Sequence, residues 1–175
     1  MSTQDIRSES AYATIDRTTP LYTIGIAAQL TGTTVSTIRM YEEKGLVIPH
    51  KAPSGHRQFS DSDIVRLRCI REHLDKRGLN IAGIKTLMSL VPCWVLKPCS
   101  EEDQQSCDAY TTSMEPCWMV SRKGPECETA DCRTCSVYHI PDRCHDLKAL
   151  YKGLIMTGEV PGDGAPTPSL HRKEV

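Results

Sequence analysis

Apolar residues recur at helical spacing in the segment that begins at Tyr22. Ile24, Ala27 and Ala28 fall on one face of a short helix. Gly32 marks the end of this helix, because glycine adopts the left-handed conformation that closes a helix without steric cost. The pattern predicts a short helix with one buried face.

A second amphipathic helix is expected over 35–44, capped by Thr34 and stopped by a glycine. Val35, Ile38 and the ring of Tyr41 face inward. The outward positions are Ser36, Thr37 and Arg39. Two short helices joined by three or four residues around a glycine have helix-turn-helix spacing, and the N-terminal half of the second helix is the part that enters a DNA major groove.

Two short extended pieces follow, separated by the turn signal Pro53-Ser54-Gly55. They predict a β-hairpin that carries basic and imidazole side chains suited to phosphates or a minor groove: His50, Lys51, His56 and Arg57. A third helix begins at a capping box of Ser60 and Asp63 and runs until Gly78. Asn80 caps a fourth helix over 81–90. The arginines of the third helix, at 66, 68 and 71, are interpreted as a solvated face.

Composition and charge divide the chain of 175 residues into two small modules. Residues 21–90 hold ten Lys and Arg against six Asp and Glu, whereas residues 91–144 hold five against nine. Only 5% of the chain is aromatic, with a single Phe, so no large core is available and a staple is expected. Residues 1–20 are expected to be flexible and residues 157–175 to be a disordered tail rich in Pro and Gly.

The N-terminus lacks the apolar segment of a signal peptide, and no apolar run approaches the length of a membrane span. We therefore expect a cytoplasmic protein that does not enter a membrane. In a reducing compartment, crowded cysteines are metal ligands or redox groups rather than stable disulfides.

Residues 21–90 resemble the winged-helix DNA-binding domain of MerR-type transcription regulators. The segments that carry the resemblance are "YTIGIAAQLTGTTVSTIRMYEEKGLVIP", "SGHRQFSDSDIVRLRCI" and "RGLNIAGIKTL". It implies that Arg39 and Tyr41 touch DNA phosphates, and that His56 and Arg57 clamp the backbone from the wing. The residues placed near base edges are Thr34, Ser36 and Thr37. It also implies that the protein distorts promoter DNA so that RNA polymerase engages both promoter elements.

Members of that family dimerise through a long helix, but no sustained heptad pattern follows residue 90 here. The remaining helical candidate is 143–156, with an apolar stripe at Leu147, Leu150, Tyr151, Leu154 and Ile155. This stripe either packs within the chain, which is the commoner fate, or pairs with a second copy. A two-fold operator still leads us to expect a homodimer.

The cysteine-rich region contains a degenerate repeat that begins twice with Pro-Cys-Trp. The first half runs Cys93-Trp94, Cys99, Cys107 and Tyr110, and the second runs Cys117-Trp118, Cys127, Cys135 and Tyr138. The last two cysteines of each half are eight positions apart, whereas the first loop spans six positions in one half and ten in the other. Cys132 and Cys144 are additional. Cys69, alone on the third helix, is interpreted as a small buried residue.

Thiolates at this density favour a soft metal centre. The candidate ligands are Cys93, Cys99, Cys107, Cys117, Cys127, Cys132, Cys135 and Cys144, with His139 and His145 as less favoured substitutes. An iron–sulfur cluster, 4Fe-4S in the first place, is favoured because a regulator gains from a ligand that changes redox state. Zinc sites and a metal-free thiol switch or soft-metal sensor remain alternatives. Residues 92–138 also resemble the "two-CW" module of some bacterial sensory proteins.

These patterns predict a mainly α protein: a winged helix-turn-helix domain over 21–91, followed by a small irregular cysteine module over 92–156 that a metal staples. The favoured function is a DNA-binding regulator that senses redox state through its cluster. A DNA-binding protein with structural zinc is the second reading. An enzyme is not expected, since no βαβ pattern surrounds the CxxC at 132–135 to support thiol–disulfide catalysis.

Overall fold

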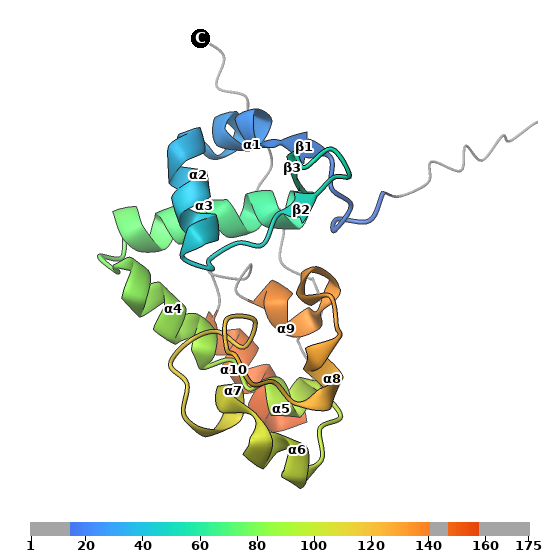
Figure 1. Cartoon of the computed structure of the whole chain (residues 1–175). Coiled ribbons are helices and arrows are strands. Elements are labelled where there is room, and N and C mark those ends of the chain that lie inside the picture. Colours follow the sequence, from blue (N-terminus) through green and yellow to red (C-terminus); the bar gives the residue numbers. More distant parts are fainter. Residues whose placement is uncertain (1–14, 141–146, 158–175) are drawn as a thin grey trace, which may run out of the picture.

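The computed structural model describes residues 15–140 and 147–157, which are mainly helical. Figure 1 shows an N-terminal domain, 15–91, at the top and a cysteine module, 92–140, below it, with α4 leading from one into the other. The domain contains β1 (Tyr22–Thr23), α1 (Ile24–Thr31), α2 (Val35–Glu43), β2 (His50–Lys51), β3 (Arg57–Phe59), α3 (Asp61–Asp75) and α4 (Ile81–Ser89). The module contains α5 (Cys93–Leu96), α6 (Glu101–Ser106), α7 (Asp108–Thr111), α8 (Pro125–Glu128), the 3₁₀ helix η1 (Cys132–Thr134) and α9 (Ser136–His139). The predicted ligand Cys144 and its neighbour His145 lie outside the described residues.

The helix ends of the N-terminal domain follow the predicted caps. Gly32 closes α1 with φ 62°, and the Thr34 hydroxyl accepts from the Thr37 amide at the start of α2. Ser60 and Asp63 form the complete capping box of α3, and Asn80 caps α4. These caps satisfy amides that a helix cannot pair internally, so they fix where each helix begins.

The predicted hairpin is confirmed, and it belongs to a three-stranded antiparallel sheet of order β1-β3-β2. Lys51 pairs with Arg57 in the hairpin, and Tyr22 pairs with Phe59 on the other side of β3. The two-residue strand β1 was not predicted, because so short a segment shows no alternation of polar and apolar residues. The sheet ties the start of α1 to the wing.

One apolar cluster joins the N-terminal domain to the cysteine module. Its buried members from the domain include Ile38, Leu67 and Ile84, and Trp118 and Tyr138 of the module belong to the same cluster. The boundary near residue 91 therefore separates two compositions but does not separate two cores.

Of the arginines that the sequence assigned to a solvated face of α3, Arg68 is exposed and Arg71 is partly exposed, but Arg66 is buried. Arg66 is 1% exposed, and its guanidinium lies over the Trp118 and Tyr138 rings of the module. Arg68 donates to the Leu30 carbonyl, and Arg71 donates to the carbonyls of Thr31 and Gly32. A cation bound to the last carbonyls of α1 stabilises that helix end.

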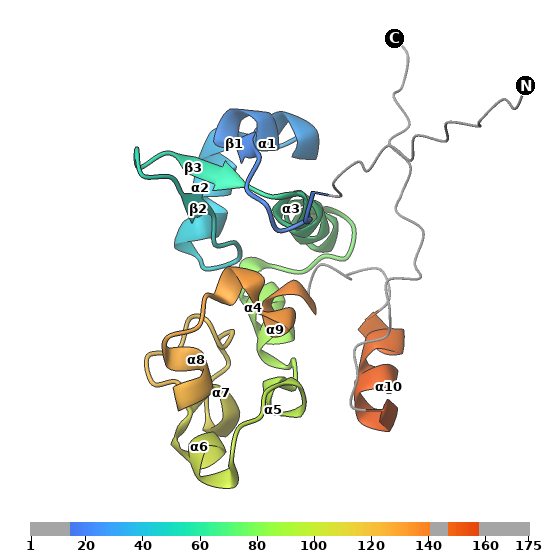
Figure 2. The same cartoon turned by 90° about the vertical axis from the view of Figure 1, so that its right-hand side faces the viewer.

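The last helix, α10 (Leu147–Thr157), packs within the chain through Leu154. Leu154 joins Val91, Val137 and Ile140 in a second apolar cluster, and Figure 2 shows α10 beside the α5 and α9 side of the module. Ile155 departs from the predicted stripe, since 81% of it is exposed. Among the described residues, no helix has the length and apolar character needed to cross a membrane.

Candidate nucleic-acid interface and thiol cavity

The N-terminal turn of α2 presents the hydroxyl groups that the sequence placed near DNA bases. The Thr34 hydroxyl lies 2.8 Å from the hydroxyls of both Ser36 and Thr37. Thr34, Ser36 and Arg39 are exposed on this helix, and Thr37 is half-buried. The hydrogen bonds of the cap hold these groups in one orientation, which suits a surface that docks into a groove.

Tyr41 does not lie on this surface. Its side chain is 3% exposed and packs in the shared core cluster, so the inward prediction for its ring is confirmed, but the expected phosphate contact is not available to it here. Burial raises the pKa of Tyr41, and the charge of Asp75 adds to this shift. Tyr41 acts in this structure as a core residue of the recognition helix.

The wing keeps its basic groups at the surface. Lys51 and His56 are exposed, on β2 and in the turn before β3. Arg57 instead forms an ion pair with Glu42 of α2, which fixes the wing against the recognition helix. The hairpin and α2 are therefore positioned as one unit.

The cysteine module forms hydrogen bonds with the segment that runs from the end of α2 to β2. The Trp118 indole Nε1 donates to the Gly45 carbonyl at 2.7 Å, and the Tyr138 hydroxyl accepts from the Ile48 amide at 2.8 Å. The Arg133 guanidinium lies 2.7 Å from Nδ1 of His50. We call these contacts of residues 45–50 with the second half-module the joint.

A glycine allows the close approach at the joint. Gly45 has φ 72°, and a Cβ placed there would overlap the Met119 side chain. We expect Gly45→Ala to lower the free energy of unfolding by about 1–2 kcal/mol more than Gly55→Ala, because the backbone strain is shared but only at position 45 does the new Cβ meet the Met119 side chain. Gly55→Ala is the matched control: φ is 79°, but nothing lies within 4 Å of its Cβ position. Urea unfolding of both variants checks this, and an equal loss in the two would show that Met119 moves aside freely.

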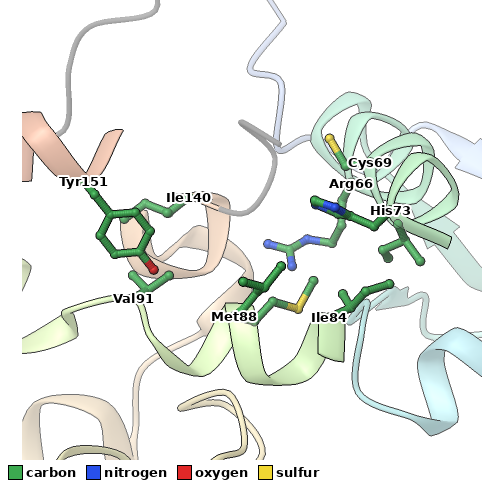
Figure 3. A pocket seen from close by; sticks show the side chains of 10 residues that line it. Arg66, Cys69, His73, Ile84, Met88, Val91, Ile140 and Tyr151 are labelled. Carbon is green, nitrogen blue, oxygen red and sulfur yellow. The ribbon is translucent and has the colours of Figure 1, made fainter. Parts of the chain in front are cut away.

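Arg66 lies beside the two aromatic rings that form the joint. Its guanidinium lies 3.7 Å from the ring centroid of Tyr138 and 5.4 Å from that of Trp118. Figure 3 shows Arg66 projecting into a cavity between α3 and α4, with Ile140 and Tyr151 on the far side. The role of Arg66 was missed from the sequence, although its spacing from Asp63 and Ile70 places it on the buried face of α3.

The repeat in the sequence corresponds to a repeat in structure. Trp94 and Tyr110 meet edge to face, with centroids 5.2 Å apart and planes at 88°. Trp118 and Tyr138 meet in the same way, at 5.0 Å and 77°. The two pairs differ in surroundings: Trp118 is 8% exposed against the N-terminal domain, whereas Trp94 is 40% exposed. Among the described residues, the hydrogen bonds of the joint come from Trp118, Arg133 and Tyr138 of the second half.

Cysteines from both halves line a second cavity inside the module, which we call the thiol cavity. They are Cys93, Cys99, Cys107, Cys117 and Cys127, with Lys97 and Lys123 in the same lining. Burial raises the pKa of Cys93 to about 11 and that of Cys117 to about 12, with neighbouring thiols adding to both shifts. Thiols with pKa values raised in this way stay protonated at neutral pH until a bound metal ion displaces their protons into the solvent.

The remaining predicted ligands are placed differently. Cys132 and Cys135 pack against the core cluster that joins the two modules. His139 uses Nε2 in a 2.6 Å contact with the Arg133 carbonyl. Cys69 is buried, as predicted, and is disulfide-bonded, whereas the other described cysteines are free thiols. Within the described ranges, no three Cys, His, Asp or Glu side chains are close enough to hold an ion as they stand.

The capped helix pair, the basic wing and the buried α3 define residues 22–90 as a winged helix-turn-helix domain. These residues match the family described as MerR HTH family regulatory protein, so this part of the chain is a MerR-family helix-turn-helix domain. The chain is 40% identical over 72 residues to "Putative heat shock protein HspR" of Streptomyces coelicolor, a match covering 41% of this chain and 48% of that protein.

Two further relatives are similar over a comparable length. "HTH-type transcriptional regulator GlnR" of Bacillus cereus is 43% identical over 72 residues, covering 41% of this chain and 55% of GlnR. "HTH-type transcriptional regulator ZntR homolog" of Haemophilus influenzae is 40% identical over 70 residues, covering 38% and 50%. The chain thus spans about half the length of these relatives. Their names are those of regulators or of a heat shock protein. The resemblance of the module to "two-CW" proteins stays a prediction.

Proposed function

We propose that the chain is a transcription regulator that binds double-stranded promoter DNA and whose cysteine module holds a thiolate-ligated metal centre that controls DNA geometry. The observation that carries the proposal is the joint, which connects the module to residues 45–50, between the recognition helix and the wing. A change in the module that moves Trp118 or Tyr138 changes the angle between two DNA-contacting elements. Bending a binding site costs a few kcal/mol, so a small bias at this position is sufficient.

The DNA-contacting groups in this proposal are the exposed hydroxyls and Arg39 of α2 together with Lys51 and His56 of the wing. A homodimer on a two-fold operator, with RNA polymerase at the same promoter, completes the proposal by analogy with the MerR-type family.

A 4Fe-4S cluster is the favoured cofactor, because the donor set is all thiol and aromatic rings cover it. When bound, it supplies a centre whose charge changes by one electron. The protein's own residues would exclude water from the centre, and Lys97 and Lys123 would neutralise the charge of the thiolates. A displacement of residues in the module would then move the residues of the joint. Zinc is the second candidate, since thiolates also suit a closed tetrahedral site.

The test combines selection of DNA with control of the cofactor. Anaerobically purified full-length protein is used to enrich duplexes from a random library, and iron, sulfide and zinc are measured on the same preparation. The affinity for the enriched duplex and its end-to-end distance by energy transfer are then compared before and after oxidation. We expect specific, salt-dependent binding and a geometry that changes on oxidation. Absence of enrichment would refute the regulator, and a zinc-replete protein with unchanged geometry would favour structural zinc.

Replacing Lys51 with alanine tests the wing. We expect weaker binding to all duplexes and a salt dependence whose log–log slope falls by about 1, because one phosphate contact and its counterion release are lost. Lys152→Ala, at an exposed lysine of α10, is the control and should leave the slope unchanged. Fluorescence anisotropy across a salt series measures both. An unchanged slope for the Lys51 variant would remove the wing from the interface.

A further inference from the structure

By what surrounds them, five of the seven described cysteines of the module fall into two groups, and the other two share features of both. Cys99, Cys107 and Cys127 line the thiol cavity and take no part in either apolar cluster. Cys132 and Cys135 pack against the core shared with the N-terminal domain, Cys135 also packs on the second cluster, and neither lines the cavity. Cys93 lines the cavity and packs on the second cluster, whereas Cys117 lines the cavity but packs on both clusters.

Cys127 belongs to the second half of the repeat but lines the thiol cavity together with the cysteines of the first half. The Asp108 amide donates to the Arg122 carbonyl at 3.0 Å, and the Arg122 guanidinium forms an ion pair with the Asp108 carboxylate at 2.8 Å. Gly124 is buried against Asp103 of α6, where a Cβ would lie 3.5 Å from the Asp103 carbonyl oxygen. These contacts bind the loop before α8 to α6 and α7, so Cys127 faces the cavity of the first half.

This crossing explains the one irregularity of the repeat. The loop from Cys117 to Cys127 spans ten positions, whereas its counterpart from Cys93 to Cys99 spans six. The longer loop lets Cys127 leave its own half and reach the other. Cys132, which has no counterpart in the first half, then stands beside Cys135 at the joint.

Local backbone and charge also favour the first group. Cys107 lies directly between α6 and α7, and the Cys99 carbonyl accepts from the Gln104 side chain of α6, so both are held next to α6, whose start has a complete capping box. Lys97, Lys123 and Asp103 line the same cavity, so the charged residues of the lining still carry a net positive charge beside thiolates whose complex with a divalent ion is an anion. The edge-to-face rings of Trp94 and Tyr110 lie in its wall.

We propose that Cys93, Cys99, Cys107 and Cys127 form one tetrathiolate metal site that spans both halves of the repeat, and that Cys117, Cys132 and Cys135 are structural residues of the joint. This inference rests on the proposed function in that it needs a metal centre, and it assigns the ligands of that centre. The site holds either a 4Fe-4S cluster or zinc by the same four sulfurs. Binding of all four sulfurs to one metal requires them to come closer together than they lie in this structure.

The test uses full-length Cys99→Ser, Cys107→Ser and Cys127→Ser proteins, with Cys132→Ser and Cys135→Ser as matched controls. Each is loaded anaerobically with ferrous iron and sulfide, and separately with zinc alone, and bound metal per chain is measured. We expect the first three to lose most of the metal that the wild-type protein binds and the two controls to retain it. Equal loss in a control, or full retention in any of the first three, would overturn the assignment.

A measurement on the wild-type protein does not depend on the folding of any variant. Thiol alkylation, followed by mass spectrometry, compares the metal-loaded with the metal-free chain. Protection should appear at Cys93, Cys99, Cys107 and Cys127 and leave Cys117, Cys132 and Cys135 unchanged. Protection of the second group, or no metal uptake in either loading, would refute the site. DNA affinity is measured on the same samples, so a failure of the regulator proposal is seen separately from a failure of the ligand assignment.

Discussion

Replacing Trp118 with alanine should lower the free energy of unfolding of the metal-free chain by about 3–5 kcal/mol, the usual loss for a buried aromatic side chain. Trp118 is 8% exposed, belongs to the shared core cluster and donates its indole N–H to the Gly45 carbonyl at 2.7 Å. The substitution removes the packing and leaves that carbonyl without its partner across the joint. Urea unfolding under reducing conditions gives the measurement.

The repeat supplies the matched control. Trp94→Ala removes the same side chain from the equivalent position, but Trp94 is 40% exposed and makes its ring contact with Tyr110. We expect a loss of about 1 kcal/mol, the scale of an aromatic pair beyond its buried area. Similar losses for the two variants would mean that the joint contributes little to stability and does not hold the module on the N-terminal domain.

The second large effect is expected at Arg66. Arg66→Met keeps the length of the side chain but removes the cation that lies 3.7 Å from the Tyr138 ring centroid. A desolvated cation–π contact of this kind contributes about 2 kcal/mol or more. In a double-mutant cycle of Arg66→Met with Tyr138→Leu, we therefore expect a coupling energy of about 2 kcal/mol.

Arg71 provides the control for this cycle, because it lies on the same helix but binds the carbonyls that end α1. The cycle of Arg71→Met with Tyr138→Leu should give a coupling energy within about 0.5 kcal/mol of zero, as expected for residues that share no contact. If the Arg66 cycle also falls in that range, the stacking of Arg66 on Tyr138 does not link the two modules.

The features that the sequence predicted well are those that depend on neighbouring residues. The caps at Thr34, Ser60 and Asn80 are local hydrogen bonds, and the hairpin turn depends on Gly55, so each could be recognised from a few adjacent letters. The spacing of the repeat likewise predicted matched halves, and the two edge-to-face ring pairs agree with it.

The features that were missed depend on contacts between distant segments. A charged residue such as Arg66 is assigned to the surface by composition alone, and its burial follows only from the rings that the module brings to it. The difference between Trp94 and Trp118 could not be predicted, because the repeat itself is nearly identical at both.

The joint also has a consequence for the order in which the protein is made. Trp118 contacts a residue 73 positions earlier, and Tyr138 contacts one 90 positions earlier, yet both belong to the core of the N-terminal domain. Ribosomes add roughly 5–20 residues per second, so residues 22–90 leave the ribosome several seconds before their core is complete. During that interval the side of α3 that carries Arg66 is uncovered. The nascent DNA-binding domain thus reaches its final stability only when the cysteine module has been synthesised, which makes the module a folding partner of the domain as well as its proposed sensor.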